Sequence, residues 1–308
     1  MNVTYITLDG YVEVEKYRYV YFVVMFTSYL LILSSNTTVV CVIVIQKNLH
    51  EPMYIFIAAL LINTMLYSTA VYPKLLIDFL SEKQIISFPV CLFQSFLFYS
   101  LSCSEFLLLT AMAYDRYVSI CKPLQYPTIM RKTLVNILLF LAWLVPACYV
   151  LVPFIGFANL KRCSLTLKGI FCNNSMIYLF CVVSRAILVY GVVVLFNLSL
   201  LPMLFILFSY TMILIVAYRS CGEVRKKAAQ TCLPHLLVLI NYSFLLTYDA
   251  IIVRLESDIS KTVRFGMTMQ IIMCSPLFNP IAYGLKMKEI YKHLRRIFYH
   301  VMGKQLLN

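Results

Sequence analysis

The sequence predicts an all-α membrane protein, a seven-transmembrane helix bundle that ends in a short amphipathic cytoplasmic helix 8. Of the 308 residues, 62% are hydrophobic and only 13% are charged, whereas soluble domains are about 45–50% apolar and about 25% charged. A disordered chain is excluded as well, because disorder requires low hydrophobicity and high charge. Since a spanning helix needs roughly 20 apolar residues, this length accommodates seven spans joined by short loops.

Seven long stretches carry almost no charge. Five of them contain no Lys, Arg, Asp or Glu, one is interrupted only by Glu105, and one has His235 as its only potentially charged residue. We expect the fifth to tilt or to project beyond the lipid, because it is longer than a bilayer requires. In chain order, the stretches are 19–46, 53–73, 84–114, 133–160, 186–218, 228–248 and 265–285.

The distribution of basic residues predicts the orientation. Of the 26 Lys and Arg residues, 15 fall in segments that share one side of the membrane, and an excess of Lys and Arg marks the cytoplasmic side. We therefore expect a single domain over 1–308 in the plasma membrane, with an extracellular segment 1–18, a bundle 19–285 and a cytoplasmic tail 286–308. The net charge of +13 then belongs mainly to the inner surface, facing lipid and a protein partner, and it does not indicate nucleic-acid binding.

The cysteines agree with this orientation. Of the 11 Cys, those on the outer side are Cys91, Cys163, Cys172 and Cys181. An even number of cysteines in the oxidising compartment predicts two disulfides, although three pairings are possible. Asn2 and Asn173 begin glycosylation sequons on the same side, and Asn2 is the better of the two sites.

Residue patterns argue against most other classes of membrane protein. The sequence has no His-Glu-x-x-His motif and no pair of aspartates within the spans, so we expect no catalysis, no metal and no cofactor. A retinal protein would need a Lys in the last span, which has none. Transporters often show repeated halves and channels show a polar face along the pore, and neither is evident. A channel or transporter is retained only as the alternative from a different class.

Isolated polar residues at membrane depth are costly and therefore suggest function. Asp115-Arg116-Tyr117 lies at the inner end of the third stretch, where a simple local ion pair beside the lipid headgroups is an equally good interpretation. Asn279-Pro280 places a kink beside a polar side chain. The remaining residues of this kind are Asn36, Asn63, Glu105, His235 and Asn241.

Five ordered motifs show a family resemblance. Residues 112–126 read Met-Ala-Tyr-Asp-Arg-Tyr-Val-Ser-Ile-Cys-Lys-Pro-Leu-Gln-Tyr, which resembles the signature of vertebrate olfactory (odorant) receptors, within the rhodopsin-like class A of G-protein-coupled receptors. Tyr72-Pro73-Lys74 is most similar to receptors of fish. The other motifs are Glu51-Pro52-Met53-Tyr54, Ser209-Tyr210, Lys-Ala-Ala-Gln-Thr-Cys at 227–232, and Pro-Leu-Phe-Asn-Pro-Ile-Ala-Tyr at 276–283.

The resemblance implies a receptor for a small-molecule odorant that activates a heterotrimeric stimulatory (olfactory) G protein and raises cyclic AMP. A receptor of the same type working outside the olfactory epithelium is the alternative, and a trafficking chaperone is a possible partner. The implied disulfides join Cys91 to Cys172 and Cys163 to Cys181. The implied activation switch comprises Asp115, Arg116, Tyr117, Tyr210, Asn279, Pro280 and Tyr283. In it, Arg116 leaves Asp115 and turns toward Tyr210 and Tyr283.

A ligand pocket is expected toward the outside, between the third, fifth, sixth and seventh helices. By analogy the third helix contributes Phe98, Tyr99 and Ser102. Residues at helical spacing on one face of the sixth helix are Tyr242, Leu245, Leu246, Asp249 and Val253. Asp249 either anchors a cationic or hydrogen-bond-donating ligand or, in the interpretation we favour, pairs with Arg254 or Arg185.

One position departs from the wider class. Counting from Pro52, the aspartate usual in the second helix falls on Thr64, which makes a coordinated sodium ion doubtful. Glu105 is expected to replace part of that charge in a structural or switching role. The stretch 289–301 resembles the surface helix of the class, with Ile290, Leu294, Ile297 and Phe298 on one face.

Overall fold

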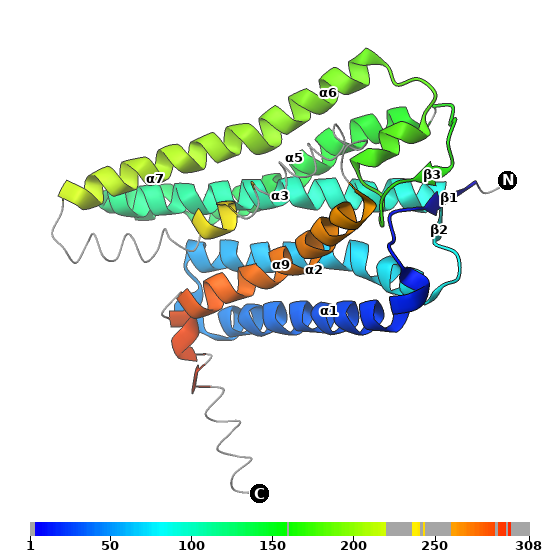
Figure 1. Ribbon diagram of the computed structural model, residues 1–308. Helices are drawn as coiled ribbons and strands as arrows, with labels where there is room; N and C mark the ends of the chain where they lie inside the picture. Colours follow the sequence, from blue (N-terminus) through cyan, green and yellow to red (C-terminus); the bar gives the residue numbers. More distant parts are fainter. Residues whose placement is uncertain are drawn as a thin grey trace, which may run out of the picture.

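A computed structural model describes residues 4–158, 160–219, 236–240, 243, 260–286, 289–293 and 295–296. Long helices lying side by side dominate the structure (Figure 1). They are α1 (Val14–Ile45), α2 (Pro52–Leu80), α3 (Phe88–Cys121), α5 (Lys132–Ala158), α6 (Arg185–Leu195), α7 (Leu201–Arg219) and α9 (Lys261–Lys286). A single π-helical turn, η4 (Phe196–Leu200), joins α6 to α7 in one continuous rod.

Within the described part of the chain, five helices are long and apolar enough to cross a membrane. They are α1, α2, α3, α5 and the continuous rod from Arg185 to Arg219. These five coincide with the first five predicted stretches, and α9 covers the seventh. The sixth predicted stretch lies mostly outside the described residues, although 236–240 is helical. The chain is therefore a largely helical, multi-pass membrane protein.

The ends of the helices differ from the ends of the charge-free stretches, because a helix can continue through charged residues. α2 continues past Lys74 to Leu80 because Lys74 and Asp78, four residues apart, form an ion pair on the helix. α3 begins at Phe88, later than expected, since 85–87 is extended, and Pro89 then occupies its first turn. α1 begins at Val14, within the segment expected to precede the bundle.

A small sheet at one end of the bundle departs from the all-α expectation. β1 (Tyr5–Leu8) is its central strand, and it pairs antiparallel with β2 (Ile85–Ser87) and parallel with β3 (Thr166–Leu167). Its register places Tyr5 opposite Ser87 and Thr7 opposite Thr166. Ile6 and Leu8 are buried beneath it. Strands of two to four residues are too short to leave a readable alternation pattern in the sequence.

Short turns complete the opposite end of the bundle. η1 (Lys47–Leu49) links α1 to α2, while η2 (Pro123–Gln125) and α4 (Tyr126–Ile129) follow α3. The segment 289–293 is helical and rests on η1, where Asn48 Nδ2 lies 3.3 Å from His293 Nε2. Ile290 is fully buried, as expected of the apolar face. Leu294, Ile297 and Phe298 lie outside the described side chains.

Two apolar clusters form the core. The first surrounds the ends of α2, α3 and α7 that lie away from the sheet and includes Tyr210 and Tyr283. The second lies beneath the sheet and includes Phe98 and Phe171. Trp143 of α5 packs against both clusters. Each cluster contains residues of one of the two candidate sites described next.

Candidate functional sites

Asp115 and Arg116, at the inner end of α3, are held together in a buried ion pair. Arg116 Nη2 lies 3.0 Å from Asp115 Oδ2, and the Asp115 side chain is fully buried. The Tyr126 hydroxyl of α4 donates to the other carboxylate oxygen, Asp115 Oδ1, at 2.8 Å. A buried charge that kept only one partner would be costly, so the pair and the tyrosine stabilise one another.

Two of the three aromatic residues assigned to the same switch are also buried. Tyr210 of α7 and Tyr283 of α9 belong to the inner apolar cluster, and Tyr117 packs against that cluster while partly exposed. α3, α7 and α9 thus each contribute to one apolar core beside the Asp115–Arg116 pair.

A polar network lies deeper in the bundle. Asn279 Nδ2, on α9, donates to Glu105 Oε1 at 2.8 Å and to Thr64 Oγ1 at 2.9 Å. All three side chains are buried, with at most 2% exposed. Two prolines flank Asn279 within α9: Pro276 precedes it and Pro280 follows it. Proline has no backbone N–H, so α9 lacks helix hydrogen bonds at these positions. The helix is therefore weakened at the same depth in the bundle as the Asn279 side chain.

Further polar contacts connect this level to α1 and α5. Asn63 Nδ2 donates to Leu101 O of α3 at 2.9 Å, and Trp143 Nε1 donates to Asn63 Oδ1 at 3.1 Å. Asn36 Nδ2 reaches Pro276 O at 3.4 Å. The amides of Asn36, Asn63 and Asn279 therefore bridge neighbouring helices, which is the role expected of such groups inside a membrane bundle.

The residues assigned to the ligand pocket on α3 lie beneath the loop after α5. The Phe98 ring centroid is 4.9 Å from that of Phe171 and 5.1 Å from that of Tyr67. The Asn174 backbone N–H donates to the Tyr99 hydroxyl at 2.6 Å. Ser102, one turn further along α3, is buried, and its hydroxyl donates to Phe98 O. Phe98 and Tyr99 thus contact Phe171 and Asn174 of the loop, and Ser102 lies one turn from Phe98 on α3.

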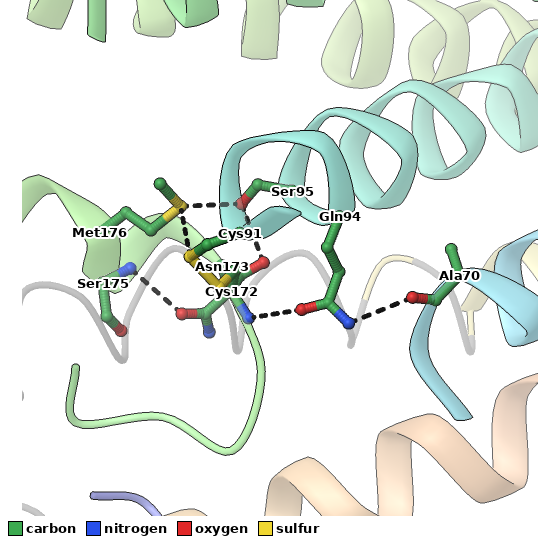
Figure 2. Close-up of a disulfide and its surroundings, with 8 residues drawn as sticks. All are labelled: Ala70, Cys91, Gln94, Ser95, Cys172, Asn173, Ser175 and Met176. Carbon is green, nitrogen blue, oxygen red and sulfur yellow. Dashed lines mark hydrogen bonds between the residues drawn. A yellow bond between two sulfur atoms is a disulfide. The ribbon is translucent and has the colours of Figure 1, made fainter. Parts of the chain in front are cut away.

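Two disulfides tie this loop together. Cys91 of α3 is joined to Cys172, and Cys163 to Cys181, which is the pairing that the family resemblance implies. Figure 2 shows that α3 also holds Cys172 through its backbone: Cys172 N–H donates to Gln94 Oε1 at 3.1 Å, and its carbonyl accepts from Ser95 Oγ at 2.8 Å. The Met176 sulfur lies 3.7 Å from Cys91 Sγ.

Several predicted site residues lie outside the described residues or side chains. They are the sequon Asn2 and the sixth-helix residues Tyr242, Leu245, Leu246, Asp249 and Val253. Arg254, one proposed partner of Asp249, lies outside as well, while the other, Arg185, is exposed at the start of α6. The sequon residue Asn173 accepts a hydrogen bond from Ser175 N–H at 3.2 Å and caps η3 (Asn174–Leu179).

Some residues of both sites were not assigned from the sequence. Tyr126 is the last residue of the 112–126 motif, so the motif contained the signal for its role. Gln94, Ser95 and Phe171 have no local signal, because their partners are distant in the sequence. Among the described residues, no group of three or more His, Cys, Asp or Glu is arranged to hold a metal ion.

The apolar helices, taken with the family match that follows, define a multi-pass signalling receptor of the G-protein-coupled type. The chain belongs to the olfactory receptor family: the sequence model of the family described as "Olfactory receptor" matches residues 24–301. Olfactory receptor 11G2 of Homo sapiens is 33% identical over 287 residues, which cover 90% of this chain and 81% of that protein. Olfactory receptor 4M1 of Mus musculus is 31% identical, with 96% and 95% covered, and olfactory receptor 10R2 of Homo sapiens is 33% identical, with 99% and 91% covered. The family is one of signalling receptors rather than enzymes.

Proposed function

We propose that this chain is an odorant receptor of the plasma membrane that binds a small-molecule odorant and activates a stimulatory, olfactory-type heterotrimeric G protein, raising cyclic AMP. In this proposal it has seven spans, an extracellular N-terminus, and a cytoplasmic C-terminus that begins with helix 8. Family membership supports the general function, and the Asp115–Arg116–Tyr126 arrangement is the observation that carries the mechanism.

The switch operates as a two-state helix bundle. In the resting state Arg116 is paired with Asp115, and Tyr126 holds the carboxylate from α4. On activation Arg116 leaves Asp115 and turns toward Tyr210 and Tyr283, which opens a cytoplasmic surface for the G protein. An odorant drives this change only by binding the active state more tightly than the resting state.

The proposed ligand site lies in the outer half of the bundle, where α3 contributes Phe98, Tyr99 and Ser102 to its lining. This lining combines aromatic rings with hydroxyl groups, as small-molecule sites do. The sixth-helix residues from Tyr242 to Val253 complete the site in the proposal. There Asp249 either contacts the ligand or pairs with Arg185 or Arg254.

An odorant-panel screen tests the function. The receptor is expressed with a trafficking chaperone in cells that carry a cyclic AMP reporter, and an active odorant is then applied to the Arg116→Ala variant at matched surface expression. We expect the response to fall to background in the variant. A response that persists would contradict the switch assignment, and an odorant-evoked current without cyclic AMP would instead indicate a channel.

A further inference from the structure

The N-terminal segment lies across the loop that covers the proposed ligand site. We call residues 4–11 the strap. Beyond the pairing of β1, its backbone donates along the loop after α5: Thr7 N–H to Leu165 O at 2.8 Å, Asp9 N–H to Leu167 O at 2.8 Å, and Gly10 N–H to Gly169 O at 3.1 Å. In Figure 1 the strap meets the loop and β2 at the same end of the bundle. The strap is therefore a structural part of the receptor's outer end.

Gly10 allows the strap to approach the loop closely. A Cβ at this position would lie 2.4 Å from the Gly169 carbonyl carbon and 2.7 Å from Ile170 N, and both are backbone atoms. Backbone atoms cannot move aside as a flexible side-chain end can, so any side chain at residue 10 would push the strap and the loop apart. Glycine is needed here for the close approach of two backbones.

Tyr11 fastens the end of the strap. Its hydroxyl lies 3.0 Å from Ile170 O on the loop and 3.1 Å from Asp78 Oδ2 on α2, and the one hydroxyl proton is shared between them. The ring meets Phe79 edge-on, with centroids 5.5 Å apart. Burial, together with the Asp78 carboxylate, raises the pKa of Tyr11 well above its usual value, so the hydroxyl stays protonated as a donor.

Phe171 lies between two anchors. On one side Gly10 and Tyr11 hold Gly169 and Ile170; on the other, the disulfide, Gln94 and Ser95 hold Cys172. Held at both ends, Phe171 is only 4% exposed and packs on Phe98. The disulfide is a covalent anchor, whereas the strap is held by hydrogen bonds that can be released.

We propose that Gly10 and Tyr11 are positioning residues that hold Phe171 as a lid over Phe98, Tyr99 and Ser102, and that the strap controls entry from the extracellular water. The description of those three residues as ligand contacts rests on the proposed function. The lid itself rests on the contacts of the strap and the loop. Loosening the strap opens the lid without removing any residue that faces the ligand.

Thiol accessibility measures the lid directly and needs no odorant. The probe is the water-soluble cation methanethiosulfonate ethyltrimethylammonium, applied to full-length receptor carrying Ser102→Cys in lipid nanodiscs. Labelling of position 102 is followed by tandem mass spectrometry, with the unsubstituted receptor as a blank for the native thiols. Tyr11→Phe keeps the ring and removes the hydroxyl. Since a buried hydrogen-bond partner is lost, we expect labelling to accelerate about tenfold.

Matched controls separate the lid from a general loss of stability. Tyr5→Phe makes the same change at an exposed position of the strap, and it should label at the parent rate. Gly10→Ala should label fast, whereas Gly266→Ala, where a Cβ would meet no atom within 4 Å, should not. If Gly10→Ala does not reach the membrane, Tyr11→Phe still carries the test, because its ring packing is intact.

A double variant tests the route through Phe171. If the strap acts by positioning this ring, Phe171→Ala alone should label fast, and adding Tyr11→Phe should change the rate by less than about twofold. Multiplying effects would overturn the proposal, as would a parent rate in Tyr11→Phe at normal thermal stability. If the lid behaves as proposed but no odorant evokes a response, the proposed function fails and the lid stands.

Discussion

In the proposed switch, Tyr126 is the residue whose contact most directly favours the resting state. Tyr126 is on α4, which follows the end of α3. Its hydroxyl donates to the fully buried carboxylate of Asp115 on α3. Burial, the Asp115 carboxylate and its hydrogen bond all raise the pKa of Tyr126. Because the pKa is raised, the hydroxyl remains a donor at neutral pH and beyond the ordinary tyrosine value of about 10, and it is lost only as the pH rises through the raised pKa.

Tyr126→Phe should therefore raise basal signalling. Removing a hydrogen bond to a charged group that exists only in the resting state, at a differential cost of about 1 kcal/mol, shifts the two-state equilibrium about fivefold. We expect basal cyclic AMP to rise by up to that factor at equal surface expression. Tyr218→Phe, at a largely exposed position of α7, is the matched control. Unchanged basal signalling would show that Tyr126 has the same partner in both states.

Asn279 carries a second prediction, on stability. Asn279→Ala removes the donor to Glu105 and Thr64 in a fully buried site. Leaving a buried acceptor short of a partner costs about 1–3 kcal/mol. The thermal denaturation midpoint of the purified receptor should fall. Gln270→Ala, which removes an exposed amide from the same helix, should leave it unchanged, and equal effects of the two variants would argue against the network.

At the scale of the element, charge-free length predicted most of the helices. A span has to satisfy its backbone internally and face lipid, so its composition is restricted over about 20 residues. Helix ends were less predictable, since the Lys74–Asp78 ion pair lets α2 continue through two charges. The sheet was missed because its central strand, Tyr5–Leu8, depends on partners some 80 and 160 positions away.

In the candidate sites, too, contacts between sequence neighbours were predictable and contacts between distant residues were not. Asp115 and Arg116 are neighbours in the sequence, so their pairing was readable from the motif. The bond from Asn279 to Glu105 spans 174 positions, and the contact of Phe171 with Phe98 joins a loop to a helix. The sequence indicated that Glu105 and Asn279 matter because polar groups are rare at that depth, but it contained nothing that paired them.

The two disulfides should differ in importance. Cys91–Cys172 closes a segment of 81 positions and fastens the lid loop to α3, while Cys163–Cys181 closes 18 positions within the loop. In the chain-entropy model the longer closure stabilises by roughly 1 kcal/mol more. Replacing both cysteines of each pair by Ala should therefore lower surface expression more for Cys91–Cys172. Flow cytometry of intact cells measures the difference, and the reverse order would contradict the anchoring role.

At the scale of the whole molecule, the two candidate sites lie at opposite ends of the same helices. α3 carries Phe98 and Tyr99 near its start and Asp115 and Arg116 near its end, and Glu105 lies between them. Asn279 of α9 contacts Glu105 at this middle level. Glu105 and Asn279 therefore lie between the two sites, and the assignment of one site to a ligand and the other to a G protein requires a defined orientation in the membrane.

The orientation gives the last prediction. If the basic side of the bundle is cytoplasmic, Asn2 lies outside and carries a glycan, so Asn2→Gln should abolish the gel shift caused by endoglycosidase. Asn173→Gln should leave most of the shift, because Asn173 caps η3 and the Ser175 of its sequon is buried. An N-terminal epitope should be stained on intact cells, and a C-terminal epitope only after permeabilisation. The opposite staining would reverse the assignment of both sites, since Arg116 would then face the extracellular medium and could not meet a G protein.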